Sequence, residues 1–143
     1  MLQAGQSAPT LEPIAELVAK GPVLLAFYKV SCPTCQLAFP FLDRISQGSL
    51  QVVGVSQDSP ELTQVFNERF GVHFKTVLDP ASAGYVLSNA FGITHVPSLF
   101  VIEADGRISH SGSGFDKAGL EALGARAGTE VFRDEKVPAS KPG

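Results

Sequence analysis

The chain has 143 residues, of which 44% are hydrophobic, and it carries a net charge of −3 with a pI near 5.5. This size and apolar content suit one domain with a hydrophobic core, and the acidic balance gives no electrostatic reason to expect nucleic acid or an anionic membrane surface as a partner. No apolar stretch approaches the roughly 20 residues that a membrane-spanning helix needs. The first five residues lack the basic and apolar regions of a signal peptide, so the sequence predicts a cytoplasmic protein.

Helices and strands are expected to alternate along the chain. Helical spacing of apolar residues predicts a helix over 12–19, and the continuously apolar residues 22–28 predict a strand that is buried on both faces. A helix is expected over 33–46, where Pro40 should cause a kink. The further predicted elements are a strand over 50–55, a helix from Asp58-Ser59-Pro60 to Gly71, a short strand over 74–78, a helix over 82–91, a strand over 98–102, an Asp105-Gly106 turn, a strand over 107–110 and a helix over 116–127.

This order of elements predicts an α/β fold with helices on both faces of a mixed sheet. Strands that alternate with helices indicate parallel pairing in the first part of the sheet. The tight turn at Asp105-Gly106 indicates an antiparallel hairpin. We expect one domain over 1–128, followed by a polar tail over 129–143.

The only two cysteines lie in Cys32-Pro33-Thr34-Cys35, between the first strand and the following helix. Two residues between cysteines at a helix start are typical of a redox dithiol. The helix N-terminus stabilises a thiolate, which is the nucleophilic form. Cys32 is therefore expected to attack a substrate disulfide, and Cys35, one turn further along and more buried, to attack Cys32 and release the product.

The cysteine pair has three alternative, structural roles. It could form a disulfide that stabilises the turn, remain as two inert thiols, or bind zinc. A closed zinc site needs four ligands, and His73, His95 and His110 show no paired spacing. No phosphate loop or dinucleotide fingerprint follows the first strand. We therefore expect neither a metal nor an organic cofactor, and a metal site shared between molecules is left open.

The chain resembles the thioredoxin superfamily over roughly residues 8–127. The resemblance rests on the Cys-x-x-Cys turn, on Pro40 five residues after Cys35, and on Val96-Pro97 before the hairpin. The added elements between 58 and 91 are similar to the branch that includes the TlpA/ResA thiol-disulfide oxidoreductases and the AhpC/TSA proteins. The resemblance implies a thioredoxin-like three-layer α/β/α fold with a mixed central sheet.

The resemblance also implies roles for individual residues. Cys32 would be the nucleophile and Cys35 the resolving thiol, with Pro97 as a cis-proline packed against them. The backbone of Val96 would pair with a substrate chain, as in strand addition, and a glycine within 111–114 would allow close approach. The implied partners are disulfide-containing or dithiol proteins and small thiols. The residues implied to border the substrate groove are Ser31, Pro33 and Thr34.

Several positions depart from the thioredoxin pattern. Ser31 replaces a tryptophan, Ala26 replaces a buried acid, and Ala38 replaces a glutamate of many TlpA-like proteins. The base that would deprotonate Cys35 is therefore not identified. Lys29 is close enough in sequence to favour a thiolate, although a solvated lysine is the simpler interpretation.

Two other functions compete with disulfide exchange. Peroxiredoxins place Thr or Ser three residues before the reactive cysteine and proline seven before it, whereas this chain has Lys29 and Leu25. A non-catalytic binding module, gated by the state of the cysteine pair, is the other alternative. Some relatives in this branch carry a cysteine or selenocysteine just beyond a Pro-Gly pair like Pro142-Gly143, which suggests that the natural chain is longer.

Overall fold

Helices and strands alternate along the chain, which the computed structural model describes from residue 1 to residue 143. Most elements lie within two residues of the ranges that the sequence predicts, because their caps and apolar patterns are local. The elements are α1 (Ile14–Ala19), β1 (Val23–Tyr28), α2 (Pro33–Ser46), β2 (Gln51–Ser56), α3 (Pro60–Arg69), β3 (Lys75–Leu78), the short 3-10 helix η1 (Ala81–Ala83), α4 (Val86–Phe91), β4 (Ser98–Ile102), β5 (Ile108–Ser113), β6 (Phe115–Asp116), α5 (Lys117–Ala127) and β7 (Ser140–Lys141).

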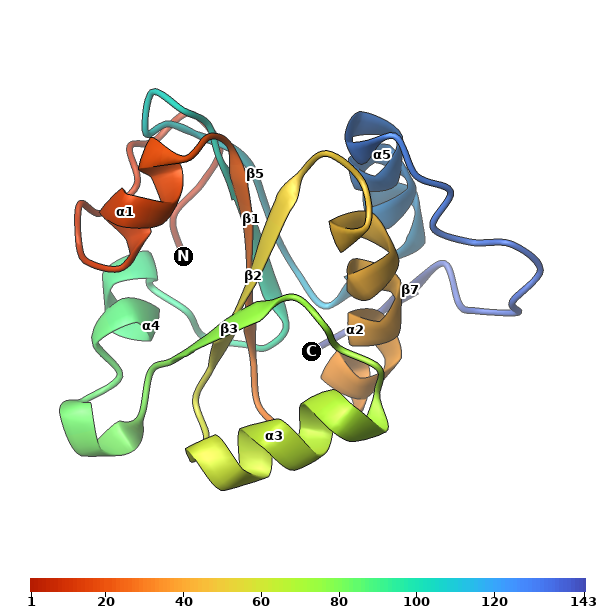
Figure 1. The fold of residues 1–143 in the computed structure, drawn as a ribbon, viewed down its shortest axis with the longest axis horizontal. Helices are drawn as coiled ribbons and strands as arrows, with labels where there is room; N and C mark the ends of the chain where they lie inside the picture. The colour runs from red at the N-terminus through yellow and green to blue at the C-terminus, as the bar shows by residue number, and fades with distance from the viewer.

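A five-stranded mixed sheet in the order β3-β2-β1-β4-β5 forms the central layer. β1 pairs in parallel with β2, which pairs in parallel with β3, whereas β4 is antiparallel to both β1 and β5. In Figure 1, α2 and α5 lie on one side of the sheet, and α1 and α4 lie on the other. This arrangement confirms the predicted mixed sheet with helices on both faces.

Alternating side chains of β1 supply both layers of the core. Leu24, Ala26 and Tyr28 belong to the cluster shared with α2, α3 and α5. Leu25 and Phe27 belong to the cluster shared with α1 and α4. Because both faces of a central strand are buried, the strand reads as a continuous apolar run instead of an alternating one.

The helix that carries the cysteines has the bounds that its sequence predicts, and the kink expected at Pro40 stays a prediction. Cys32 is the N-cap residue of α2, and Pro33, which has no backbone N–H to satisfy, occupies the first turn. The helix continues without interruption through Pro40. Its Phe39 ring stacks on Tyr28 with ring centroids 4.2 Å apart, and burial of such a ring contributes roughly 1.5–3 kcal/mol.

Two predicted elements differ from the structure. The single helix expected over 82–91 is wrong, because the backbone of Gly84 and of Tyr85 adopts positive φ angles of 80° and 51° between η1 and α4. The strand expected over 107–110 continues as β5 to Ser113, because Ser98 and Leu99 of β4 supply pairing partners for its polar end. Neither difference follows from local composition.

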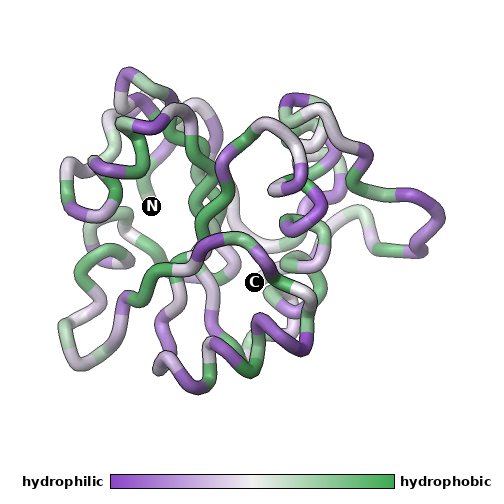
Figure 2. Tube along the Cα trace, viewed as in Figure 1, coloured by the Kyte–Doolittle hydropathy of each residue, from purple (hydrophilic) through white to green (hydrophobic).

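The residues after α5 return along the domain, although they were predicted as a polar tail. Val131 is only 3% exposed and belongs to the core cluster of α2 and α5, and Phe132 packs against that cluster. Figure 2 shows a hydrophilic turn after these residues, which projects away from the hydrophobic sheet. The chain then pairs again, since β7 is antiparallel to β6. The domain boundary at residue 128 stays a prediction.

No helix has both the length and the apolar character needed to cross a membrane.

Candidate active site

The sulfur of Cys32 lies where the chain turns from β1 into α2. Its Sγ accepts a hydrogen bond from the backbone N–H of Cys35, at 3.1 Å, and donates one to the carbonyl oxygen of Val96, at 3.4 Å. Cys32 is partly exposed, and both cysteines are free thiols. The structure therefore shows a reduced pair whose outer sulfur faces solvent at the positive end of a helix dipole.

Cys35 has the opposite environment. It is fully buried in the cluster between α2 and the sheet. Burial raises the pKa of the Cys35 thiol, and the hydrogen bond with Cys32 raises it further. A buried thiol that holds its proton is inert until a neighbouring group or a change in Cys32 alters it. The two sulfurs thus differ in access and in protonation, as the sequence predicts from their positions.

Two side chains hold the loop that precedes Cys32. The carboxylate of Asp58 accepts a hydrogen bond from the N–H of Val30 at 2.8 Å, and the amide of Gln36 donates to the carbonyl of Val30 at 3.0 Å. The sequence predicts Asp58 only as part of a helix start, whereas the N-cap of α3 is Ser59. Asp58 is a positioning residue that sequence reasoning missed, because Val30 lies 28 positions away.

Val96 and Pro97 approach the dithiol from the other side. Their peptide bond is cis, as the resemblance implied, and Pro97 is buried. The carbonyl of Pro97 accepts a hydrogen bond from the N–H of Gly114 at 2.8 Å. The loop before β4 is thereby tied to the end of β5, and the carbonyl of Val96 points at Cys32.

A pocket of about 450 Å³ opens beside Cys32. Cys32, Pro33 and Val96 line one side of it, and α4 lines another with Ser88 and Asn89.

The buried carboxylate of Asp79 positions α4 beside this pocket. It accepts hydrogen bonds from the N–H groups of Leu87 and Ser88 and from the Ser88 hydroxyl, at 2.6 to 2.8 Å. The wall of the pocket is therefore set by a polar side chain from the loop after β3.

The structure brings most of the predicted site residues together. Cys32, Pro33 and Val96 share the pocket, whereas the exposed Ser31 does not line it. Thr34 is only 3% exposed, because the returning C-terminal chain covers it. Of the glycines within 111–114, Gly114 meets the C-terminal chain, since an added Cβ would lie 2.6 Å from the carbonyl oxygen of Lys141.

The hydroxyl of Tyr28 lies near both Asp58 and Cys35. Burial raises the pKa of the Tyr28 hydroxyl, hydrogen bonds with Thr76 and Asn67 lower it, and the charge of Asp58 raises it. The hydroxyl donates its proton to the side-chain oxygen of Asn67 at 2.8 Å. Cys32 is the side chain that hydrogen-bonds the Cys35 sulfur, and no other side chain does so.

A reduced dithiol at a helix start, beside a cis-proline on a mixed sheet, defines a thioredoxin-like protein. The chain belongs to the Redoxin family, whose model matches residues 4–127. The thioredoxin-like fold and the family branch expected from the sequence are thereby confirmed.

Two curated proteins are similar to this chain. Over 91 residues it is 26% identical to the thiol-disulfide oxidoreductase ResA of Geobacillus thermodenitrificans, which covers 60% of this chain and 51% of that protein. Over 116 residues it is 28% identical to the thiol:disulfide interchange protein HelX of Rhodobacter capsulatus, which covers 73% of this chain and 65% of that protein. The chain thus spans about half to two thirds of the length of these relatives.

Solved structures share the fold. The thioredoxin domain of a thiol-disulfide oxidoreductase from Bacteroides vulgatus has a TM-score of 0.74 at 17% identity, covering 88% of this chain and 98% of that one. A secreted disulfide oxidoreductase from Mycobacterium tuberculosis has a TM-score of 0.64 at 18% identity, covering 78% of this chain and 85% of that one. At these identities the likeness concerns the fold.

Proposed function

We propose that this chain is a thiol-disulfide oxidoreductase that exchanges disulfides through Cys32 and Cys35. The observation that carries the proposal is the asymmetry of the pair, in which a partly exposed Cys32 sulfur caps α2 and a fully buried Cys35 lies one turn behind it. Membership of the Redoxin family and the similarity to ResA and HelX, which are named as disulfide-exchange proteins, support it.

The reaction has two steps. The Cys32 thiolate attacks one sulfur of a substrate disulfide, forming a mixed disulfide and releasing the other sulfur as a thiolate. Cys35 then gives up its proton and attacks the Cys32 sulfur, which forms the Cys32–Cys35 disulfide and releases the second substrate sulfur as a thiolate that takes up a proton. Two electrons pass from the protein to the substrate, and the reverse sequence oxidises a substrate dithiol.

The remaining site residues are proposed to bind the substrate. Val96 presents backbone to the pocket beside Cys32, and Pro33 lines the same pocket. Pro97, which is buried next to Val96 in the chain, is proposed to hold that residue in place. Ser31 precedes the first cysteine, Thr34 lies two residues after it, and both are proposed as the rim of the groove.

The partners proposed are disulfide-containing or dithiol proteins and small thiols, and the cytoplasmic location expected from the sequence stays a prediction. Fractionation of the native host would test the location. The peroxidase alternative is not favoured, since the curated relatives are described as disulfide-exchange proteins.

The test is the reduction potential of the Cys32–Cys35 couple. The protein is equilibrated in dithiothreitol or glutathione buffers, and its thiols are alkylated and weighed. A value near about −270 mV indicates a reductant, and one toward about −120 mV indicates an oxidant of partner proteins. Cys32→Ser should lose turnover of a disulfide substrate, and Cys35→Ser should accumulate the mixed disulfide. If no intramolecular disulfide forms in any of these redox buffers, the proposal is overturned.

A further inference from the structure

The C-terminal residues 138–143, which we call the C-terminal segment, lie against the dithiol turn. The Thr34 hydroxyl donates a hydrogen bond to the carbonyl oxygen of Pro142 at 2.7 Å, across 108 positions of sequence. Gly143 lines the pocket together with Cys32, and a Cβ added to it would overlap the carbonyl oxygen of Val96. Figure 1 shows the C-terminus returning to the side of α2.

The place that this segment occupies is the place where a substrate chain is expected. A chain that reaches Cys32 in an extended form would run beside Val96 and over Thr34. The C-terminal segment already does so, and part of it is held in an extended form by pairing with β6. Lys141 pairs with Phe115, and the N–H of Lys117 donates to the carbonyl of Ala139 at 3.0 Å.

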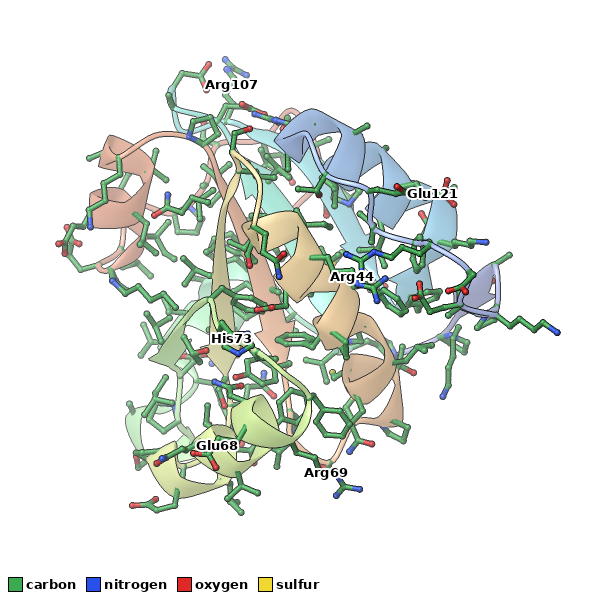
Figure 3. All side chains as sticks on the ribbon, turned by 45° about the vertical axis from the view of Figure 1, so that its right-hand side comes forward. Arg44, Glu68, Arg69, His73, Arg107 and Glu121 are labelled. Atoms are coloured by element: carbon green, nitrogen blue, oxygen red, sulfur yellow. The ribbon has the colours of Figure 1, made fainter.

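The returning chain is anchored in the core at its root and is exposed at its tip. At the root, Val131 is buried, and the Arg44 guanidinium binds both carboxylate oxygens of Glu135 at 2.8 and 3.1 Å. Figure 3 shows Arg44 on α2 beside the returning chain. At the tip, Pro142 and Gly143 are exposed, and Lys141 is half-buried. A segment that is buried at one end and exposed at the other can be displaced without unfolding the domain.

We propose that residues 138–143 are an internal competitor that occupies the protein-substrate groove along Thr34 and Val96. The proposal rests on the proposed function, since it names which substrates that site admits. A protein chain must displace the segment before it can reach Cys32. A small disulfide enters through the open pocket beside Pro33 and leaves the segment in place.

Amide exchange tests the displacement directly. In Cys35→Ser protein, Cys32 is joined by a disulfide either to a short peptide with one central cysteine or to β-mercaptoethanol. With the peptide, exchange of the Lys117 amide should rise at least about tenfold, because its acceptor on Ala139 leaves. With β-mercaptoethanol, the protection should stay. Equal protection in both adducts overturns the internal competitor, whereas failure to form either adduct overturns the proposed disulfide exchange instead.

Turnover gives a second and independent measurement. Gly143→Val places a side chain against the Val96 carbonyl, and Glu135→Gln removes the ion pair at the root. Each should raise kcat/KM for insulin reduction about 3- to 10-fold. In the wild type, the molecules whose groove is occupied by the segment cannot bind insulin, and this lowers the apparent affinity for insulin. Because Gly143 itself lines the pocket that a small disulfide enters, the small substrate is measured on Glu135→Gln, whose turnover of hydroxyethyl disulfide should change less than about twofold.

Glu130→Gln is the matched control, because it removes one carboxylate from the same part of the chain and Glu130 is exposed. Glu130→Gln should leave the turnover of both substrates unchanged. If Glu135→Gln accelerates turnover of both substrates equally, or if neither variant accelerates insulin reduction, the segment does not select between protein and small-molecule disulfides and the proposal fails.

Discussion

The sulfur of Cys32 lies 3.1 Å from the backbone nitrogen of Cys35, so the outer cysteine caps the helix that carries the inner one. A capping side chain normally supplies an oxygen at this position, and here a sulfur takes that place. The same geometry places one sulfur at the surface and the other in the core. Reactivity and burial are therefore divided between two residues of one helical turn.

The first prediction concerns the order in which the thiols react. Iodoacetamide should modify Cys32 at least about ten times faster than Cys35 in the folded protein, because Cys35 is buried and its pKa is raised. Peptide mapping by mass spectrometry measures both rates. In denaturant the two rates should converge, which serves as the control. Equal rates in the folded protein would contradict the buried, protonated state of Cys35.

The second prediction separates two roles of Asp58. Asp58→Ala should lower the free energy of unfolding by about 1 kcal/mol and slow disulfide turnover, because the N–H of Val30 loses its acceptor and the loop before Cys32 loosens. Asp58→Asn keeps an acceptor oxygen and should stay close to wild type in both measurements.

If Asp58→Asn is as slow as Asp58→Ala while its stability is intact, Asp58 acts through its charge and not by holding the loop. That outcome would make it the candidate for the missing base of Cys35. Thermal unfolding and insulin reduction, measured on the same preparations, distinguish the two results.

The third prediction concerns the acid side of the stability curve. The Arg126 guanidinium and then the Ser109 hydroxyl, by hydrogen bonding, hold the pKa of Glu103 at about 2. Because the folded pKa lies below the ordinary value of 4.5, the stabilisation is present above about pH 4.5 and is lost as the pH falls toward 2. Glu103→Gln should therefore be less stable than wild type at pH 7 by up to about 1 kcal/mol, and this difference should shrink below pH 4.5.

Urea unfolding between about pH 3 and 7 measures this difference. Glu121→Gln is the control, since Glu121 is exposed on the same helix as Arg126 and forms no ion pair (Figure 3). A difference between wild type and Glu103→Gln that does not change with pH would show that the ion pair is not its source.

The fourth prediction compares two glycines of α5. A Cβ on Gly124 would overlap Cγ2 of the buried Val131 and lie 3.1 Å from the carbonyl oxygen of Thr129. Gly124→Ala should therefore destabilise the protein by about 1–3 kcal/mol, even though alanine favours a helix. A Cβ on Gly119 would meet only the mobile end of the Asp116 side chain, at 2.6 Å. Gly119→Ala should be neutral or stabilising by up to about 1 kcal/mol, and equal thermal unfolding of the two variants would contradict the close packing of residues 129–131 on α5.

Much of the fold was predictable because its signals are local. The apolar run of β1, the proline in the first turn of α2 and the Asp105-Gly106 turn each specify the conformation of a few neighbouring residues. The break at Gly84 and Tyr85 has one local signal, the glycine that ends η1 in the left-handed conformation, whereas the positive φ of Tyr85 has none. The Asp79 carboxylate starts a new helix at Val86 instead, through hydrogen bonds that depend on where the loop after β3 ends.

The sequence by itself determined the chemistry of the candidate site, because Cys32 and Cys35 belong to one helical turn and their order along it decides which is outer and which is buried. The tertiary structure decided what surrounds them. Val96 lies 64 positions from Cys32, and Pro142 lies 108 positions from Thr34, so only the packing of β4, β6 and α2 places them in contact. Local spacing specifies a helix cap, whereas a groove and its occupant depend on the path of the whole chain.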